Sequence, residues 1–195
     1  MTAAPERADA RANHARLLDA AAELFAERGM SAEIRDVAER AGLSVGAVYR
    51  HFASKDDLIA AILDQLHAET ERVIDAAIAI DELGDALRAL VRSAVELALR
   101  RGELVKAMLE AGALDARFAA ASTRRRALTA RLRGLIERGM AEGAFRADLD
   151  PAVAAATLSV AFQPWSLAVL REERTTDALV DQFVDLFLRG ACDRR

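Results

Sequence analysis

One short stretch, residues 34–55, carries the pattern of two helices joined by a tight turn, and it limits the fold more than any other feature of this chain. Ile34, Val37 and Ala38 fall at the i, i+3 and i+4 positions of one apolar helix face. Gly42 then supplies a residue that tolerates a positive φ angle where this helix must end and turn.

A second helix follows the turn directly. Ser44 is a favourable N-cap, and the residues from Val45 to Phe52 can continue as a helix with Val48 and Phe52 on its inner face. Leu43 supplies an apolar side chain for the angle between the two helices. Two short helices around a glycine-containing turn form the helix-turn-helix unit, which places its second helix in the DNA major groove.

Residues 16–58 resemble the DNA-binding domain of the TetR (tetracycline repressor) family of bacterial transcriptional regulators. The matching residues are Ala20, Ala21, Leu24, Phe25, Gly29, Val37, Ala38, Ala41, Gly42, Leu43, Ser44, Gly46, Tyr49, His51, Phe52, Ser54, Lys55 and Leu58. The chain departs from the family pattern at residues 30–33, a shorter loop without the usual Thr or Ser just before the second helix. We therefore expect that helix to be capped by Ser31 or by no side chain.

The resemblance implies which residues meet DNA. Small residues at the start of the recognition helix would approach the base edges, namely Val45, Gly46 and Ala47. Polar and basic residues would hold phosphates, namely Ser44, Tyr49, His51 and Lys55. Arg35 and Arg50 are further candidates for DNA contact.

Composition and periodicity predict an all-α chain of about nine helices. Only three Pro and ten Gly occur among the 195 residues. We expect residues 1–10 to be disordered, residues 11–57 to form a three-helix DNA-binding domain, and residues 58–195 to form a helical ligand-binding and dimerisation domain. The predicted helices span residues 11–28, the two of the motif, a long one from residue 55 past residue 74, 85–100, 104–109, 116–140, one from Pro151 with a kink at Pro164, and 176–188.

The second domain resembles TetR-family C-terminal domains in layout alone. The resemblance implies that its last two helices pair with those of a second subunit, and the apolar stripe of the last helix is the predicted interface: Val180, Phe183, Val184 and Phe187. It also implies a cavity for a small apolar effector, for which the candidates are Met108, Phe118, Phe162 and Trp165.

Charge and composition exclude several other classes of protein. The net charge is −4, but residues 40–55 contain no acidic residue, which leaves a local positive face for DNA. The scattered His14, His51 and His67 predict no metal site, and the single Cys192 fits a reducing cytoplasm. No cofactor motif, nucleophile–base pair, signal peptide or membrane-length apolar run occurs in the sequence.

These features predict a cytoplasmic homodimeric transcriptional regulator, most simply a repressor, that binds double-stranded DNA at a palindromic operator and is released by a small apolar effector. Two alternatives stay open at this point. The second domain could serve dimerisation alone, in a DNA-binding protein without ligand control. Alternatively, the chain could be a helical carrier or enzyme, although no residues for catalysis are evident.

Overall fold

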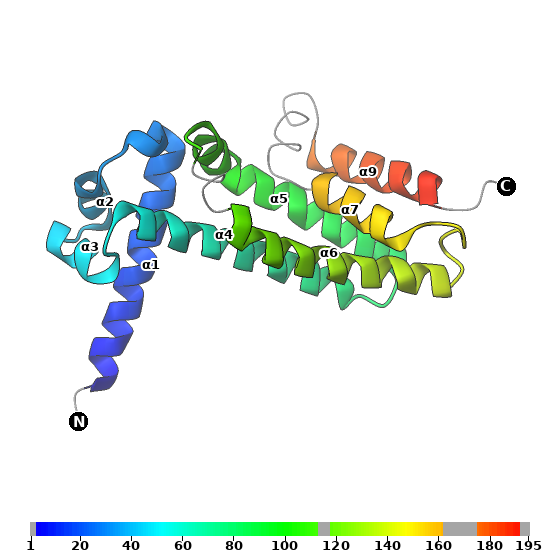
Figure 1. Ribbon diagram of the computed structural model, residues 1–195, viewed down its shortest axis with the longest axis horizontal. Coiled ribbons are helices and arrows are strands. Elements are labelled where there is room, and N and C mark those ends of the chain that lie inside the picture. Colours follow the sequence, from blue (N-terminus) through cyan, green and yellow to red (C-terminus); the bar gives the residue numbers. More distant parts are fainter. Residues whose placement is uncertain (1–2, 113–117, 162–174, 192–195) are drawn as a thin grey trace. The chain divides into compact units, whose positions relative to one another are not determined.

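The computed structural model describes residues 3–112, 118–161 and 175–191, with side chains described for residues 8–112, 126–160 and 175–190 (Figure 1). The described backbone is helical and contains no strand, so the predicted all-α class is confirmed. Its elements are α1 (Ala3–Arg28), the 3-10 helix η1 (Gly29–Ser31), α2 (Ile34–Ala41), α3 (Val45–His51), α4 (Lys55–Ile78), α5 (Leu83–Glu110), α6 (Phe118–Ala141), α7 (Pro151–Ala161) and α9 (Thr176–Ala191). None of the described helices is both long and apolar enough to span a bilayer.

The chain divides into two compact units. Unit 1 comprises Met1–Leu66 and Glu103–Ala116, and unit 2 comprises His67–Gly102 and Arg117–Arg195. The first unit therefore extends beyond the predicted domain of residues 11–57, because it includes the first half of α4 and the last part of α5.

Unit 1 is built around one apolar core. The side chains of Leu17 and Phe25 on α1, Val48 on α3 and Leu58 on α4 are fully buried there. Met108, far away in sequence on α5, is fully buried in the same cluster. The helix-turn-helix is thus supported by a segment that its own sequence motif does not include.

Two helix boundaries differ from the prediction. Helix α1 begins at Ala3, so residues 3–10 are helical where a disordered arm is predicted. Alanine is the strongest helix former, and Pro5 lies in the first turn, where its missing N–H is not needed. The predicted helices 85–100 and 104–109 are one continuous helix, α5. The polar residues between them do not break it, since Arg101 pairs with Glu69 at 2.7 Å.

Unit 2 packs α4, α5, α6, α7 and α9 around a second core. Leu87, Leu132 and Ile136 are fully or almost fully buried there. Gly139 permits a close approach, because a Cβ atom at this position would lie 2.5 Å from the ring of Phe145. The segment with the predicted kink at Pro164 lies outside the described residues.

Candidate nucleic-acid interface

The turn between α2 and α3 has the geometry that its sequence predicts. Gly42 adopts a left-handed conformation with φ of 65°, and the backbone N–H of Leu43 donates to the carbonyl of Ala38 at 2.9 Å. Ser44 caps α3, since its Oγ accepts a hydrogen bond from the backbone N–H of Ala47 at 3.1 Å. These contacts fix α3 against α2 by local rules alone.

The start of α2 is capped differently from the prediction. Its N-cap is Glu33, and the backbone N–H of Glu33 donates to Oδ2 of Asp36 at 3.1 Å. Ser31 instead donates its hydroxyl hydrogen to the carbonyl of Arg28 at 3.1 Å. Of the two predicted alternatives, a cap at Ser31 is therefore wrong, and so is an end without any side-chain cap, because Glu33 and Asp36 form a capping box. An acidic residue at the third position of a helix, as in a capping box, is the signal that would have identified Asp36.

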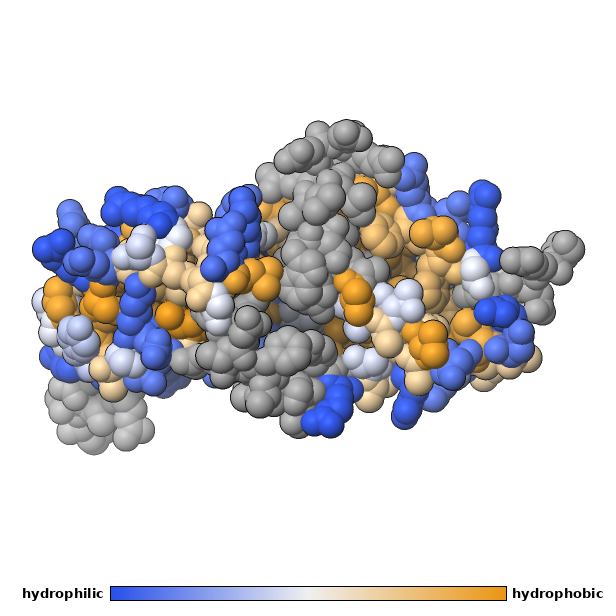
Figure 2. Space-filling model, turned by 45° about the horizontal axis from the view of Figure 1, so that its top comes forward, coloured by the Kyte–Doolittle hydropathy of each residue, from blue (hydrophilic) through white to orange (hydrophobic). Residues whose placement is uncertain are grey.

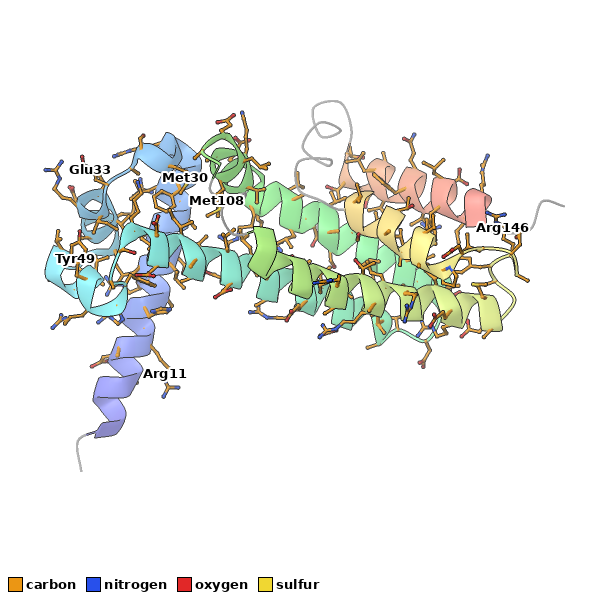
Figure 3. The ribbon with its side chains drawn as sticks, in the orientation of Figure 1. Arg11, Met30, Glu33, Tyr49, Met108 and Arg146 are labelled. Carbon is orange, nitrogen blue, oxygen red and sulfur yellow. The ribbon has the colours of Figure 1, made fainter. Side chains whose placement is uncertain are left out.

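The outer face of α3 presents a small, partly apolar surface. Val45 is 40% exposed, and Tyr49, which is labelled on α3 in Figure 3, is 53% exposed. Gly46 is exposed as well, and a Cβ atom there would meet only Oγ of Ser44, at 4.0 Å. Ala47 is 6% exposed, so its methyl group belongs to the core and is not available to a base, contrary to the prediction.

Two arginines that count toward the positive charge of this region are engaged within unit 1. Arg16 on α1 donates to the backbone carbonyl of Ala41, at the C-terminal end of α2. Arg40 on α2 pairs with Glu27 at 2.6 Å and with Glu23 at 3.3 Å, both on α1. The hydrogen bond from Arg40 lowers the pKa of Glu27, and the same bond raises the pKa of Arg40. Both arginines therefore hold α1 and α2 together.

Lys55 is also engaged. Its Nζ donates to the backbone carbonyls of Met30 at 2.5 Å and of Ala32 at 2.8 Å. It also lies 5.5 Å from the centroid of the Phe25 ring. The sequence predicts Lys55 as a phosphate contact, yet its ammonium group is directed into the loop between α1 and α2.

Other basic residues of unit 1 stay accessible. Arg50 is exposed on α3, and Arg11, labelled in Figure 3, is exposed on α1. Neither contacts another described side chain through a hydrogen bond or ion pair. Among the described residues, Arg35 pairs with Glu33 alone, at 3.4 Å, and both side chains are largely exposed.

The two histidines of this unit lie together. The rings of His14 and His51 are 5.8 Å apart, and His14 lies 4.8 Å from the ring of Phe52. Burial lowers the pKa of His14, and the charge of His51 lowers it further. His51 is only half-buried, so it can still reach a phosphate at the end of α3.

Comparison with known families agrees with this geometry. A model described as bacterial regulatory proteins, tetR family, matches residues 17–62, and one described as a tetracyclin repressor-like C-terminal domain matches residues 81–165. The transcriptional repressor KstR2 of Rhodococcus jostii is 30% identical over 139 residues, which cover 69% of this chain and 68% of that protein. The chain belongs to the TetR family.

Two further similarities to this TetR-family chain differ in how much of it they cover. An HTH-type transcriptional repressor of Mycobacterium tuberculosis is 48% identical over 61 residues, but the match spans only 31% of this chain and 32% of that protein. The solved structure of KstR2 from M. tuberculosis has a TM-score of 0.64 and 27% identity, and covers 93% of this chain and 95% of that one. TetR-family regulators bind operator DNA as dimers and respond to small-molecule effectors, and membership implies a regulator rather than an enzyme.

The predicted ligand-pocket residues are not brought together in the described part of this TetR-family chain. Met108 is buried in the core of unit 1. The side chain of Phe118, and residues Phe162 and Trp165, lie outside the described residues. Unit 2 instead contains an apolar hollow of about 320 Å³ between α5, α7 and α9. It is lined by Leu87, Val91, Leu149, Val153, Ala154, Thr157, Leu158, Phe183, Val184, Leu186, Phe187 and Gly190.

The predicted dimer residues of α9 divide into two groups. Val180 and Val184 are almost fully buried against Val91 and Val95 of α5 in the same chain, so they are core residues and not interface residues. Phe183 and Phe187 are half-buried and line the hollow, with Phe187 packed edge-on against Phe145 at 5.9 Å. The strongest apolar stripe of an amphipathic helix faces its own core first, which explains the difference.

The rim of this hollow and the adjoining face of α7 are exposed on unit 2. Leu186 on α9 is 73% exposed, and Val153 and Val160 on α7 are each 62% exposed. Figure 2 shows hydrophobic side chains at the surface among hydrophilic ones over this part of the chain. Exposed apolar side chains grouped on adjacent helices are typical of interaction surfaces.

Proposed function

We propose that this TetR-family regulator is a repressor that binds a palindromic operator as a homodimer and is released by a small apolar effector. The observation that carries the DNA part is the outer face of α3, where exposed Val45, Gly46 and Tyr49 follow a capped turn. In a dimer, two such helices would enter successive major grooves about 34–36 Å apart on one face of the duplex.

The DNA contacts follow from exposure and charge. Val45 and the backbone at Gly46 would approach the base edges. Ser44, Tyr49, Arg50 and His51 would contact phosphates around the groove, with Arg35 at the start of α2 as a further contact. A recognition surface this small supplies few direct base contacts, so operator choice would depend also on half-site spacing and DNA shape.

The effector part is supported by the hollow in unit 2. Thr157 supplies the one hydroxyl among the described lining residues, and that hydroxyl already donates to the carbonyl of Val153 at 2.9 Å. The lining therefore favours an apolar ligand. The structural relative KstR2 is named a ketosteroid transcriptional regulator, so polycyclic apolar compounds belong in the first set of ligands to be tested.

Such a ligand releases DNA only if it binds the DNA-free conformation more tightly than the DNA-bound one. The coupling free energy in allosteric proteins is typically about 1–3 kcal/mol, equivalent to roughly a 5- to 150-fold change in operator affinity. A regulator of chromosomal operators would work in the cytoplasm, which agrees with the composition of the chain.

The first experiment is selection of DNA fragments from the region around the protein's own gene. A Tyr49→Ala, Arg50→Ala double variant serves as the control, because both side chains are exposed and neither supports the core. Recovery of a palindrome by the wild type alone supports the proposal. Failure of folded wild-type dimer to retain any palindrome at low salt contradicts it.

The second experiment titrates apolar compounds against the protein–operator complex. If a compound releases the operator from the wild type, and releases less of it from Leu87→Trp, whose substitution lies in the hollow, effector control through this site is supported. If no compound in the set alters operator binding, the alternative of a constitutive DNA-binding dimer without ligand control is favoured instead.

A further inference from the structure

The C-terminal end of α2 is held by a side chain from another helix. Arg16 on α1 donates from its guanidinium group to the backbone carbonyl of Ala41, the last residue of α2. Ala41 is buried, and a carbonyl at the end of a helix has no partner within that helix. A buried carbonyl without a partner is unfavourable, so its partner must come from outside α2.

Other carbonyls at this end of α2 are satisfied by the turn itself. The backbone N–H groups of Gly42 and Leu43 donate to carbonyls of the last turns of α2, at 3.0 and 2.9 Å. Neither of these hydrogen bonds reaches the carbonyl of Ala41. Arg16 thus completes a cap that the local sequence begins, and its positive charge also suits the negative end of the α2 dipole.

The guanidinium group also lies against the turn that follows α2. A Cβ atom at Gly42 would lie 3.1 Å from Nη2 of Arg16. Oδ1 of Asn13, one turn earlier on α1, lies 3.5 Å from Nη1, the other terminal nitrogen. Leu17, the next residue of α1, is fully buried in the core of unit 1 and fixes the backbone from which Arg16 extends. The packing of α1 therefore places this group where the chain leaves α2.

This point of the chain determines how the recognition helix is oriented. Gly42 and Leu43 are the two residues between α2 and Ser44, the N-cap of α3. A change in their backbone angles would turn α3 as a whole relative to α2. Because α3 has seven residues, of which Ala47 and Val48 are buried, its placement depends on the turn as well as on the core.

We propose that Arg16 is a positioning residue: by capping α2 at Ala41, it holds the turn at Gly42 and keeps α3 in one orientation before DNA is bound. The DNA part of this inference rests on the proposed function, whereas the cap can be measured on the free protein. The cap is compatible with a phosphate contact in the complex, since a guanidinium group has five N–H donors.

The first test compares Arg16→Met with Arg11→Met in amide hydrogen exchange. Both variants lose one arginine of α1, but Arg11 is exposed and pairs with no described side chain. We expect Arg16→Met to accelerate exchange at the amides of Gly42 and Leu43 about three- to tenfold. Arg11→Met should leave both rates unchanged. The amide of Val37, at the start of α2, is the internal reference, because general unfolding of unit 1 would accelerate it as well.

Arg16→Lys is the rescue variant. Lysine keeps the positive charge and can donate to the same carbonyl, so exchange at Gly42 and Leu43 should stay within about twofold of the wild type. Exchange as fast as in Arg16→Met would mean that a cationic donor at this position does not cap Ala41, contrary to the inference.

The second test measures the affinity of the same variants for operator and for random DNA, at a temperature where each is folded. A side chain that contributes a phosphate contact alone supports both affinities alike. The orientation of α3 matters for the bases of the operator. We therefore expect the preference of Arg16→Met for operator over random DNA to fall at least about threefold, and that of Arg11→Met to equal the wild type.

Unchanged exchange at Gly42 and Leu43 in Arg16→Met would overturn the cap, and equal losses of affinity for operator and random DNA would overturn the positioning of α3. If Arg16→Met does not fold, Arg16→Ala takes its place, because alanine is the strongest helix former. If the wild type selects no operator, the proposed function fails, and the exchange rates still decide whether Arg16 caps α2.

Discussion

Gly46→Ala separates the stability of the recognition helix from its ability to approach DNA. Gly46 is the second residue of α3, it is exposed, and its φ angle lies outside the positive region that favours glycine. A Cβ atom there would meet only Oγ of Ser44, at 4.0 Å, which is ordinary van der Waals contact. The fold itself therefore does not require a glycine at this position.

The magnitudes follow from this geometry. Alanine in place of a helical glycine stabilises a protein by about 0.5–1 kcal/mol when nothing clashes. For a domain of this size, the melting temperature should then rise by about 1–4 °C. If α3 enters the major groove by its start, the added methyl group occupies space that the base edges need. We expect operator affinity to fall at least about tenfold, or about 1.4 kcal/mol.

Gly134→Ala is the matched control. Gly134 is an exposed glycine inside α6, and a Cβ atom there would meet nothing within 4 Å. Both variants should gain stability in thermal denaturation, and only Gly46→Ala should bind operator more weakly in fluorescence anisotropy. Equal operator binding by Gly46→Ala and the wild type would refute the close approach of α3 to the bases.

Three other substitutions test separate parts of the structure. Gly139→Ala should destabilise unit 2 by about 1–3 kcal/mol, because its Cβ would lie 2.5 Å from the ring of Phe145; an unchanged denaturation midpoint would contradict this packing. The pKa of His14 is lowered by burial and then by His51, so the folded state should lose stability as the pH falls below about 6.5 and through the lower folded pKa. His14→Gln should flatten the fall in melting temperature between about pH 7.5 and 5.5, and an unaltered pH profile counts against the assigned shift. Leu186→Asp, at a side chain that is 73% exposed, should leave the subunit folded but shift the dimer toward monomer in light scattering, and a dimer of unchanged stability would place the interface elsewhere.

The parts of this fold that sequence predicts well are those determined by neighbouring residues. A left-handed turn needs Gly42, and the orphan N–H groups of α3 need a side chain such as Ser44. The buried positions of α1 and α4 recur with the period of an α-helix, which is also set by residues that are close in sequence. These rules act within a few residues, so one sequence is enough to apply them.

Other features depend on residues far apart in the chain. Met108 is large and apolar, which suits a ligand pocket and a core equally well, and only the packing of the end of α5 within unit 1 decides between them. The hollow in unit 2 is lined mostly by aliphatic residues without a distinctive spacing. Val180 and Val184 lie on the stripe predicted for a partner subunit, but α5 covers that stripe first.

The number of accessible cations on the predicted DNA-binding face also depends on residues far apart in the chain, and it determines how strongly operator binding should depend on salt. Residues 40–55 contain no acidic residue, yet Arg40 pairs with acidic residues of α1, Arg16 binds a carbonyl of α2, and Lys55 binds two loop carbonyls. The accessible candidates are Arg11, Arg35 and Arg50.

If those three residues alone supply the cationic phosphate contacts in each subunit, the dimer releases about six counterions and the slope of log K against log salt is about −5. If the three engaged cations also reached phosphates, the slope would be about twice as steep. A measured slope near about −10 would mean that DNA draws these side chains out of the contacts that hold unit 1 together. A slope near about −5 would mean that this unit keeps its internal ion pairs and meets DNA as a preformed surface.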